Sequence, residues 1–274
     1  MAETGPQGRA EIRDLLVRHG LRPNQTFGQN FLVDPNVIRR IVALADVGEG
    51  SPVVEIGGGT GTLTGALAAE GAHVVVYEID AGLVGILEET LGDHRNVEIR
   101  HADASKVNLG DALDGGPWSL VANLPYNVGT GIVLDALRFA PNVDRFVVMV
   151  QREVADRLLA GPGSRTYGLP SVVTALYAQG SIAFGVPKAV FFPEPSIGSA
   201  VVELTRHPAP DNAEQAIQIA AAAFGQRRKM LRKSLGPVVA DPVAVLGRAG
   251  VDPTARPEDL APEDFVRIAA EVGE

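Results

Sequence analysis

The chain has 274 residues, of which 46% are apolar, and it carries a formal net charge of −9. This length suits one large domain plus a smaller appendage, and no stretch approaches the roughly 18 uncharged apolar residues that a membrane span needs. The chain has no cysteine, which excludes disulfides, thiolate metal sites, iron–sulfur chemistry and attack on a base by a cysteine nucleophile.

The first predicted elements belong to an N-terminal helical extension, residues 1–50, that we expect to pack on the large domain. Its first 20 residues mix Arg with Glu and Asp and lack an apolar core, so we expect no secretory signal and a cytoplasmic protein. Asp34 is suited to cap a helix that starts at Pro35, since apolar residues then recur at helical spacing at Val37, Ile38, Ile41, Val42 and Ala45.

From residue 53 onward, apolar runs alternate with helical stretches. The runs cover residues 53–56, 74–78, 97–101, 119–122 and 146–151. This alternation predicts a mainly parallel sheet with helices on both faces, which is a Rossmann-like α/β domain. Two later runs, 182–186 and 201–205, are expected to pair as an antiparallel edge. We predict that this domain covers residues 1–205 and that a small helical domain covers residues 206–274.

A glycine-rich turn follows the first strand of this sheet. Glycines at 57, 59 and 61 allow the backbone to turn tightly and to approach a ligand closely at the start of the next helix. A dinucleotide-binding turn would need a further glycine at 62 or 64, where the chain has threonine. The turn therefore favours a methyl donor, and a nicotinamide-dependent dehydrogenase is the weaker alternative.

Two acidic residues stand at the ends of the next two strands. Glu78 ends the second strand, 21 residues after Gly57, where a carboxylate can bind both hydroxyls of a ribose. Asp103, just past the third strand, can accept a hydrogen bond from the amino group of the donor's adenine. Ligands of such sheets bind at the carboxyl ends of the strands, so we expect both acids beside the glycine turn.

The sequence Asn123-Leu124-Pro125-Tyr126 follows the fourth strand and suits an amino group on a planar base. Such an amine is a poor nucleophile because its lone pair is delocalised into the ring. The Asn123 side chain and the Leu124 carbonyl offer two acceptors that favour a pyramidal nitrogen. Tyr126 offers a ring face for stacking, and Pro125 stiffens the corner. These residues predict methyl transfer to the exocyclic amine of a base.

Near the C-terminus, residues 227–233 hold five cations in seven positions. We predict one helix with an apolar stripe and an exposed cationic face that follows RNA phosphates, with a merely solvated charged face as the alternative. The five histidines lack metal-ligand spacing, so no metal is expected. The candidate RNA-binding residues are Arg227, Arg228, Lys229, Arg232 and Lys233.

Taken in order, these pieces resemble the ribosomal RNA adenine N6,N6-dimethyltransferase family, the enzymes whose loss gives kasugamycin resistance. The resemblance runs from about residue 25 to residue 236 and comprises several independent motifs. They are Gly28-Gln29-Asn30-Phe31-Leu32, the glycine turn, Glu78-Ile79-Asp80, Asp103-Ala104, Asn123 to Asn127, Gln151 to Arg157, Tyr167-Gly168 and Phe224 to Lys229.

The resemblance implies that the substrate is a pair of adjacent adenosines near the 3′ end of small-subunit (16S) ribosomal RNA, within an immature small subunit. It also places Phe191, from the family's F-x-P-x-P motif, on the second face of the target base, and we expect a chain that is monomeric when free. The implied donor is S-adenosyl-L-methionine, with S-adenosyl-L-homocysteine as product. The implied donor contacts are Gln29, Asn30, Leu32, Gly57, Gly59, Gly61, Glu78, Asp103 and Asn123.

The chain departs from the family pattern at two places. Gly58 stands where the family usually has proline, which loosens the turn and keeps its amide donors. Ser196-Ile197-Gly198 replaces the usual Lys-Val-Asp, which weakens the case for a basic contact at position 196.

Two alternatives to the small-subunit enzyme stay open. One is a relative that methylates large-subunit (23S) RNA and confers macrolide resistance; Asn127 and the segment 226–229 favour the small-subunit enzyme over it. The other is a non-catalytic ribosome-assembly factor, and the intact donor and target motifs argue against it.

Overall fold

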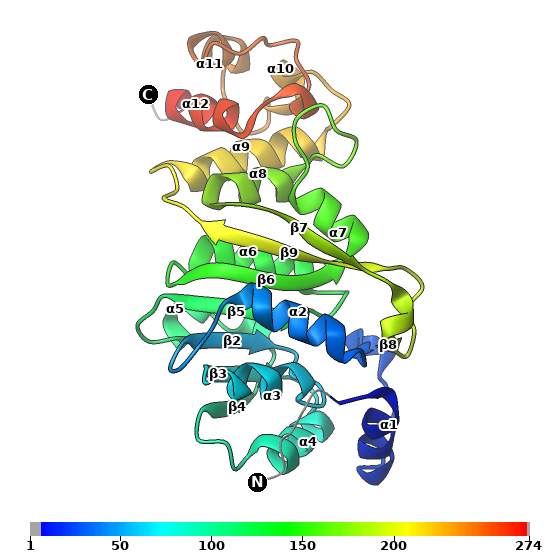
Figure 1. Cartoon of the computed structure of the whole chain (residues 1–274). Helices are drawn as coiled ribbons and strands as arrows, with labels where there is room; N and C mark the ends of the chain where they lie inside the picture. Colours follow the sequence, from blue (N-terminus) through cyan, green and yellow to red (C-terminus); the bar gives the residue numbers. More distant parts are fainter. Residues whose placement is uncertain (1–6, 273–274) are drawn as a thin grey trace. The chain divides into compact units, whose positions relative to one another are not determined.

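The computed structural model describes residues 7–272, so residues 1–6 of the predicted N-terminal extension and residues 273–274 lie outside the described part. The chain divides into two compact units (Figure 1). One holds the residues up to 155 together with 180–205, and the other holds 156–179 together with the residues from 206 onward. The predicted division at residue 206 thus omits the segment 156–179. That segment forms helix α8 (Leu169–Tyr177), which packs on α9 (Ala213–Gly225).

A seven-stranded sheet forms the centre of the first unit, in the order β4-β3-β2-β5-β6-β9-β7. The strands from β4 to β6 in this order are parallel to their neighbours, whereas β9 is antiparallel to β6. This confirms the predicted mainly parallel sheet and shows that the last strand enters between β6 and β7. The strands are β2 (Pro52–Ile56), β3 (His73–Glu78), β4 (Val97–His101), β5 (Trp118–Asn123), β6 (Val143–Gln151), β7 (Ala178–Val186) and β9 (Ser199–Arg206).

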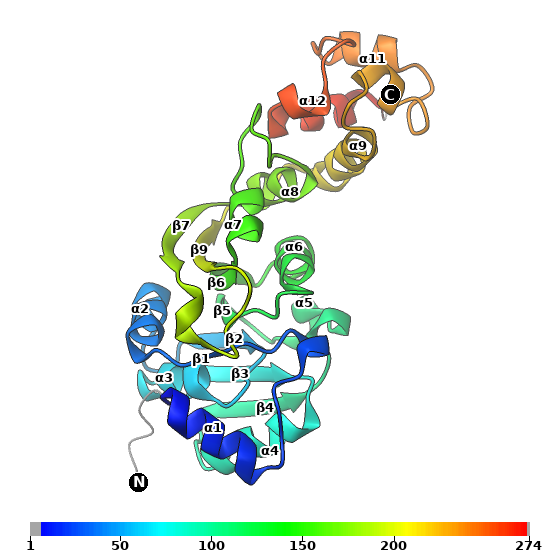
Figure 2. The ribbon, with the colours of Figure 1, turned by 90° about the vertical axis from the view of Figure 1, so that its right-hand side faces the viewer.

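Helices cover both faces of this sheet. Figure 2 shows α2 (Pro35–Ala45) and α3 (Thr62–Ala69) on one face, and α5 (Leu109–Ala112) and α6 (Gly129–Phe139) on the other. Helix α4 (Ala81–Leu91) packs beside β4. Helix α2 begins as predicted, because the Asp34 side chain accepts the Asn36 amide at 2.8 Å. Its five predicted apolar residues are buried in the core between the helix and the sheet.

The N-terminal segment is tied to the first unit by packing and by strand pairing. Helix α1 (Arg9–Arg18) buries three apolar side chains in a cluster with Leu83 and Ile86 of α4. A 3₁₀ turn, η1 (Gln25–Phe27), then leads into β1 (Phe31–Leu32), which pairs antiparallel with β8 (Phe191–Phe192).

The second unit is built mainly from helices. Besides α8 and α9 it contains α10 (Leu231–Ser234), α11 (Pro242–Arg248) and α12 (Pro262–Val272), while α7 (Arg152–Leu158) spans the division between the units. The Phe224 ring packs against the rings of Tyr167 and Phe265, with centroids 5.6 and 5.9 Å away. Within residues 7–272, no helix combines the length and the apolar character that crossing a bilayer requires. The first unit also contains the 3₁₀ turns η2 (Ala104–Lys106) and η3 (Lys188–Val190), and the second unit contains η4 (Pro257–Asp259).

Candidate active site

A cavity at the carboxyl ends of the parallel strands brings together most of the predicted site residues. Its walls come from the turns after β2, β3, β4 and β5 and from the segment before β1. This is the place where open α/β sheets bind their ligands, because the loops that leave the strands diverge there. The predicted residues that line the cavity are Gln29, Asn30, Leu32, Gly57, Gly59, Glu78, Asp103, Asn123, Leu124, Pro125 and Tyr126.

The glycine turn reaches the cavity through backbone conformations that favour glycine. Gly57 and Gly59 have φ angles of 81° and 59°, in the left-handed region. A Cβ atom on Gly57 would lie 3.6 Å from the Pro125 ring, and one on Gly59 would lie 3.4 Å from the Phe31 ring. The two glycines therefore keep the turn open between the two walls, so a ligand can approach its backbone.

The other two glycines of the turn serve packing. Gly61 has a φ of 83°, caps α3 and does not line the cavity; a Cβ there would lie 2.9 Å from Leu91. Its predicted role as a donor contact is therefore not supported. A Cβ on Gly58 would lie only 2.5 Å from Val76 and 3.0 Å from Leu87. These two side chains fill the space beside the position at which the family usually has proline.

Backbone amides hold the carboxylate of Glu78 in place. One oxygen accepts the Gly59 amide at 2.9 Å, and the other accepts the amides of Ile79 and Asp80 at 2.9 and 3.0 Å. Burial raises the pKa of this carboxyl, and the three amides act in the opposite direction. The result is an oriented acceptor at the end of β3, as a ribose contact requires.

Asp103 is a second acceptor on the cavity wall, and it caps η2. Its carboxylate accepts the Ser105 amide and hydroxyl at 3.1 and 2.6 Å and lies 3.1 Å from the Lys106 ammonium. The Ser105 hydroxyl first, and Lys106 second, hold the pKa of this carboxyl below its usual range. Asp103 is therefore ionised near neutral pH, which suits an acceptor for an amino group.

The segment before β1 closes against the Asn123 corner. The Asn123 Nδ2 group donates to the Asn30 carbonyl at 3.1 Å, and Asn30 Nδ2 donates to the Gly28 carbonyl at 3.1 Å. Gly28 has a φ of 65°, and a Cβ there would lie 3.2 Å from the Tyr126 amide nitrogen. Gln29 is held by Asp80, to which its Nε2 group donates at 2.9 Å. Because the Asn123 nitrogen donates to the protein, its oxygen is the atom that can accept an N–H from a ligand.

A hydrogen bond across the fold fixes Tyr126. Its hydroxyl lies 2.6 Å from the hydroxyl of Ser199, a buried residue at the start of β9. Burial raises the pKa of the Tyr126 phenol, which is therefore neutral at physiological pH. Sequence reasoning did not give Ser199 a role, because no local pattern links it to Tyr126, 73 positions earlier in the chain.

Phe191 does not line the cavity in this structure, so its position does not support the prediction that it stacks on the target base. Its side chain is 0% exposed and packs in the core with Ile38. Pairing of β8 with β1 sets Phe191 opposite Leu32 and directs its ring inward. The aromatic residues that line the cavity beside Tyr126 are Phe27, Phe31 and Tyr77.

Glu55 is a cavity residue to which sequence reasoning gave no role. Its side chain is 1% exposed, and its Oε2 atom has no hydrogen-bond partner among the described residues. Burial raises the pKa of Glu55 to about 8; the Thr64 hydroxyl opposes this shift and the Glu78 carboxyl adds to it. Glu55 is therefore mainly protonated at neutral pH. The only signal in the sequence is an acid inside an apolar strand next to the glycine turn.

The sequence predicted one helix for the cationic segment 227–233, but the structure shows a turn followed by a short helix. Helix α9 ends at Gly225, a turn follows in which the Lys229 amide donates to the Gln226 carbonyl at 2.8 Å, and α10 begins only at Leu231. Arg227 is partly buried and forms an ion pair with Glu258 at 2.8 Å. The other four predicted cations are exposed.

Among residues 7–272, no group of three or more histidine, aspartate or glutamate side chains is placed to hold a metal ion.

The chain is similar to known proteins that are named as ribosomal RNA methyltransferases. The family model described as "Ribosomal RNA adenine dimethylase" matches residues 20–274. A protein of Kineococcus radiotolerans named ribosomal RNA small subunit methyltransferase A is 46% identical over 270 residues, which cover 95% of this chain and 89% of that protein. A protein of the same name from Thermobifida fusca is 43% identical over 269 residues, covering 95% and 94% of the two chains.

Two solved structures share the fold. The 23S rRNA methyltransferase ErmE has a TM-score of 0.66 at 28% identity, over 89% of this chain and 100% of its own. A dimethyladenosine transferase from Plasmodium falciparum has a TM-score of 0.73 at 21% identity, over 87% and 95% of the two chains. The match over residues 20–274, and relatives more than 40% identical over almost the whole length, establish that the chain belongs to the ribosomal RNA adenine dimethylase family.

Proposed function

We propose that this chain transfers methyl groups from S-adenosyl-L-methionine to N6 of two adjacent adenosines near the 3′ end of small-subunit ribosomal RNA, during assembly of that subunit. The observation that carries the proposal is the meeting of the glycine turn, Glu78 and the Asn123–Tyr126 corner at one cavity. The relatives named as small-subunit enzymes are 43 and 46% identical to the chain, against 28% for the large-subunit enzyme ErmE, which favours the small subunit.

The cavity residues fit the methyl donor. Glu78 is an oriented carboxylate for the ribose hydroxyls, and Asp103 is an ionised acceptor for the amino group of the adenine. Gly57 and Gly59 keep the space beside their backbone free for the rest of the molecule. When bound, the donor supplies an electrophilic methyl group on a sulfonium. The protein therefore has mainly to position the amine.

The Asn123 corner supplies that positioning. The Asn123 side-chain oxygen and the Leu124 carbonyl accept the two N6 hydrogens, which turns the nitrogen lone pair toward the methyl group and stabilises the positive charge that develops on nitrogen. The Leu124 amide donates to the Met149 carbonyl at 3.0 Å, which fixes the corner on β6. Stacking on Tyr126 contributes roughly 1–3 kcal/mol and offsets part of the cost of extruding the base.

The exposed cations of the second unit bind the RNA. Arg228, Lys229, Arg232 and Lys233 offer four positive charges to phosphates, so affinity should fall steeply as salt rises. The RNA is presented in an immature small subunit in the cytoplasm, and the chain acts as a monomer.

Methyl transfer by the purified protein tests the proposal. Immature small subunits, bare small-subunit RNA and large subunits are incubated with the donor, and the digested RNA is analysed by mass spectrometry. We expect dimethyladenosine near the 3′ end of the small-subunit RNA with the wild type and with Asn36→Ala, an exposed control asparagine on α2. Asn123→Ala should bind the donor in a titration and yield no product, because its acceptor oxygen is lost.

The other outcomes are also decisive. Product only in large-subunit RNA would replace the proposal by the macrolide-resistance type of enzyme. Binding to immature subunits without methylation of any RNA would identify a non-catalytic assembly factor. A product yield with Asn123→Ala equal to that of the wild type would remove the mechanism and leave the substrate assignment intact.

A further inference from the structure

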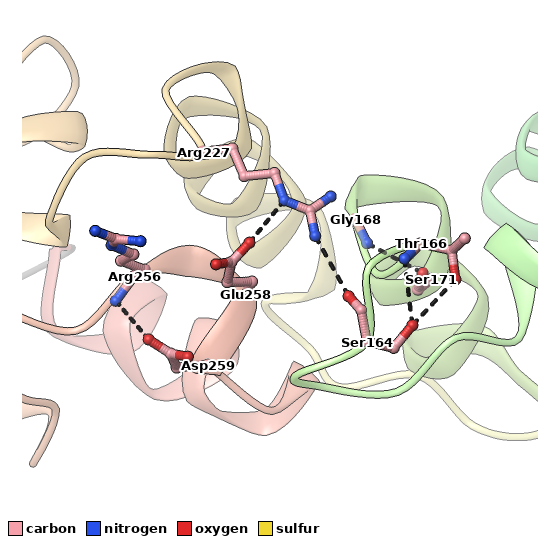
Figure 3. A network of polar contacts seen from close by, with 8 residues as sticks. All are labelled: Ser164, Thr166, Gly168, Ser171, Arg227, Arg256, Glu258 and Asp259. Atoms are coloured by element: carbon pink, nitrogen blue, oxygen red, sulfur yellow. Dashed lines mark hydrogen bonds and ion pairs between the residues drawn. The ribbon is translucent and has the colours of Figure 1, made fainter.

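A network of polar contacts joins three loops of the second unit, and Figure 3 shows the part of it that involves Arg227, Glu258 and Ser164. The Arg227 Nε group donates to a carboxylate oxygen of Glu258 at 2.8 Å, and an Nη group of Arg227 donates to the Ser164 carbonyl at 3.3 Å. The Gly163 amide donates to the Glu258 carbonyl at 2.7 Å. These contacts connect the loop 161–166, the turn after α9, and η4.

We propose that Arg227 braces this surface instead of contacting a phosphate, and that the loop 161–166 it holds presents Arg165 as an additional phosphate contact. This inference rests on the proposed RNA binding by the exposed cations of the second unit. The first observation that supports it is that Arg227 already has protein partners. Two of its nitrogens donate to protein acceptors, and its side chain is only 35% exposed.

Arg165, unlike Arg227, has an exposed side chain. Within the described residues, no carboxylate lies at ion-pair distance from its guanidinium. It directly follows Ser164, the residue that accepts from Arg227, while the exposed Arg228 directly follows Arg227. The network thus sets the separation between two chain positions that each carry a solvent-exposed guanidinium. Arginine is suited to bidentate phosphate contacts when its backbone is held in place.

The loop needs such a brace because its own contacts are local. The Ser164 amide bonds the Gly161 carbonyl at 3.2 Å, and the Tyr167 amide bonds the Ser164 carbonyl at 3.2 Å. Gly163 has a φ of 78°, and nothing lies within 4 Å of a Cβ built on Gly161 or Gly163. Packing of Tyr167 on Phe224 anchors one end of the loop. Without the contacts to Arg227 and Glu258, binding would have to order Arg165 at an entropic cost.

The direction in which Glu258→Gln changes the RNA affinity distinguishes a bracing role from a simple electrostatic effect. Glu258→Gln removes a negative charge, so the electrostatic field alone predicts tighter RNA binding. A glutamine amide offers Arg227 only a neutral acceptor in place of the charge-assisted bond, which weakens the brace. A weakened brace predicts weaker RNA binding instead, by roughly 3- to 5-fold, which is most of the affinity that one phosphate contact contributes at about 0.1 M salt. Glu271→Gln is the matched control, because Glu271 pairs with Arg248 at 2.8 Å elsewhere in the same unit. This control should bind as tightly as the wild type, or slightly tighter.

The experiment measures the Kd for 3′-terminal small-subunit RNA with the full-length protein between about 50 and 200 mM salt. Arg165→Gln should lower the slope of log affinity against log salt by about 0.7–0.9 and weaken binding roughly 5-fold at about 0.1 M salt. Adding Glu258→Gln to Arg165→Gln should cause little further loss, because the brace acts through Arg165. Arg227→Lys keeps the charge, loses the forked geometry and should behave like Glu258→Gln, which provides a second variant if one is unstable.

Folding of each variant is checked by thermal unfolding and by donor titration, since the donor cavity lies in the first unit. The inference is overturned if Glu258→Gln and Arg227→Lys bind RNA as tightly as the wild type, or if Arg165→Gln keeps the wild-type salt slope. Failure of the wild type itself to bind this RNA would instead refute the proposed RNA partner. The two failures are therefore distinguishable.

Discussion

Glu55 should make the folded state less stable as the pH rises through the neutral range. Burial without a partner for Oε2 raises the pKa of Glu55 from 4.5 to about 8. Between these two values the folded chain retains a proton that the unfolded chain releases. The stability that this proton contributes is complete below about pH 4.5 and is lost as the pH rises to about 8.

The size of the effect follows from the two pKa values. One pKa unit corresponds to 1.36 kcal/mol, so a change from 4.5 to about 8 corresponds to at most about 5 kcal/mol. Water entry and small movements around the carboxylate reduce this value, and we expect on the order of 2–5 kcal/mol. Glutamine has nearly the shape of the protonated acid and does not titrate, so Glu55→Gln should remove the effect.

Urea unfolding of the wild type and of Glu55→Gln over a pH series measures this directly. The stability of the variant relative to the wild type should increase by those 2–5 kcal/mol between about pH 5 and pH 9, because the other titrating groups cancel in the difference. The exposed Asn36, which does not titrate, gives a control, and Asn36→Ala should follow the wild-type profile. Parallel profiles for the wild type and Glu55→Gln would refute the argument, because Glu55 would then titrate equally in both states.

Substitutions at three further positions test the roles given to Gly57, Tyr126 and Phe191. Gly57→Ala places a side chain at a φ of 81°, which costs about 1–2 kcal/mol, and donor binding by calorimetry should weaken; an unchanged Kd would show that the turn does not approach the donor. Tyr126→Phe loses only the bond to Ser199 and should raise KM for RNA slightly, whereas Tyr126→Ala should lose roughly 1–3 kcal/mol of stacking; equal effects would contradict a stacking ring. Phe191→Ala should lower the unfolding free energy by about 3–5 kcal/mol, whereas a base-stacking role predicts normal stability and poor RNA binding.

The sequence alone determined the sheet, the start of α2 and most of the residues that line the cavity. These features depend on local properties, such as the alternation of apolar runs, the Asp34-Pro35 cap and glycines where the backbone turns left-handed. The place of Glu78 and Asp103 followed as well, since acids at the ends of parallel strands reach the same edge of a sheet.

The tertiary structure decided which groups the side chains meet. Pairing of β8 with β1 turned Phe191 into the core, and Glu258, 31 positions along the chain, gave Arg227 an ion-pair partner. Ser199, 73 positions from Tyr126, forms a hydrogen bond to the Tyr126 hydroxyl, and close packing left Glu55 buried without a partner for Oε2. The conformational preferences of neighbouring residues determine the backbone conformation of each helix, strand or turn. The contact partners of a side chain that lie far away in the sequence are determined only when these elements pack together.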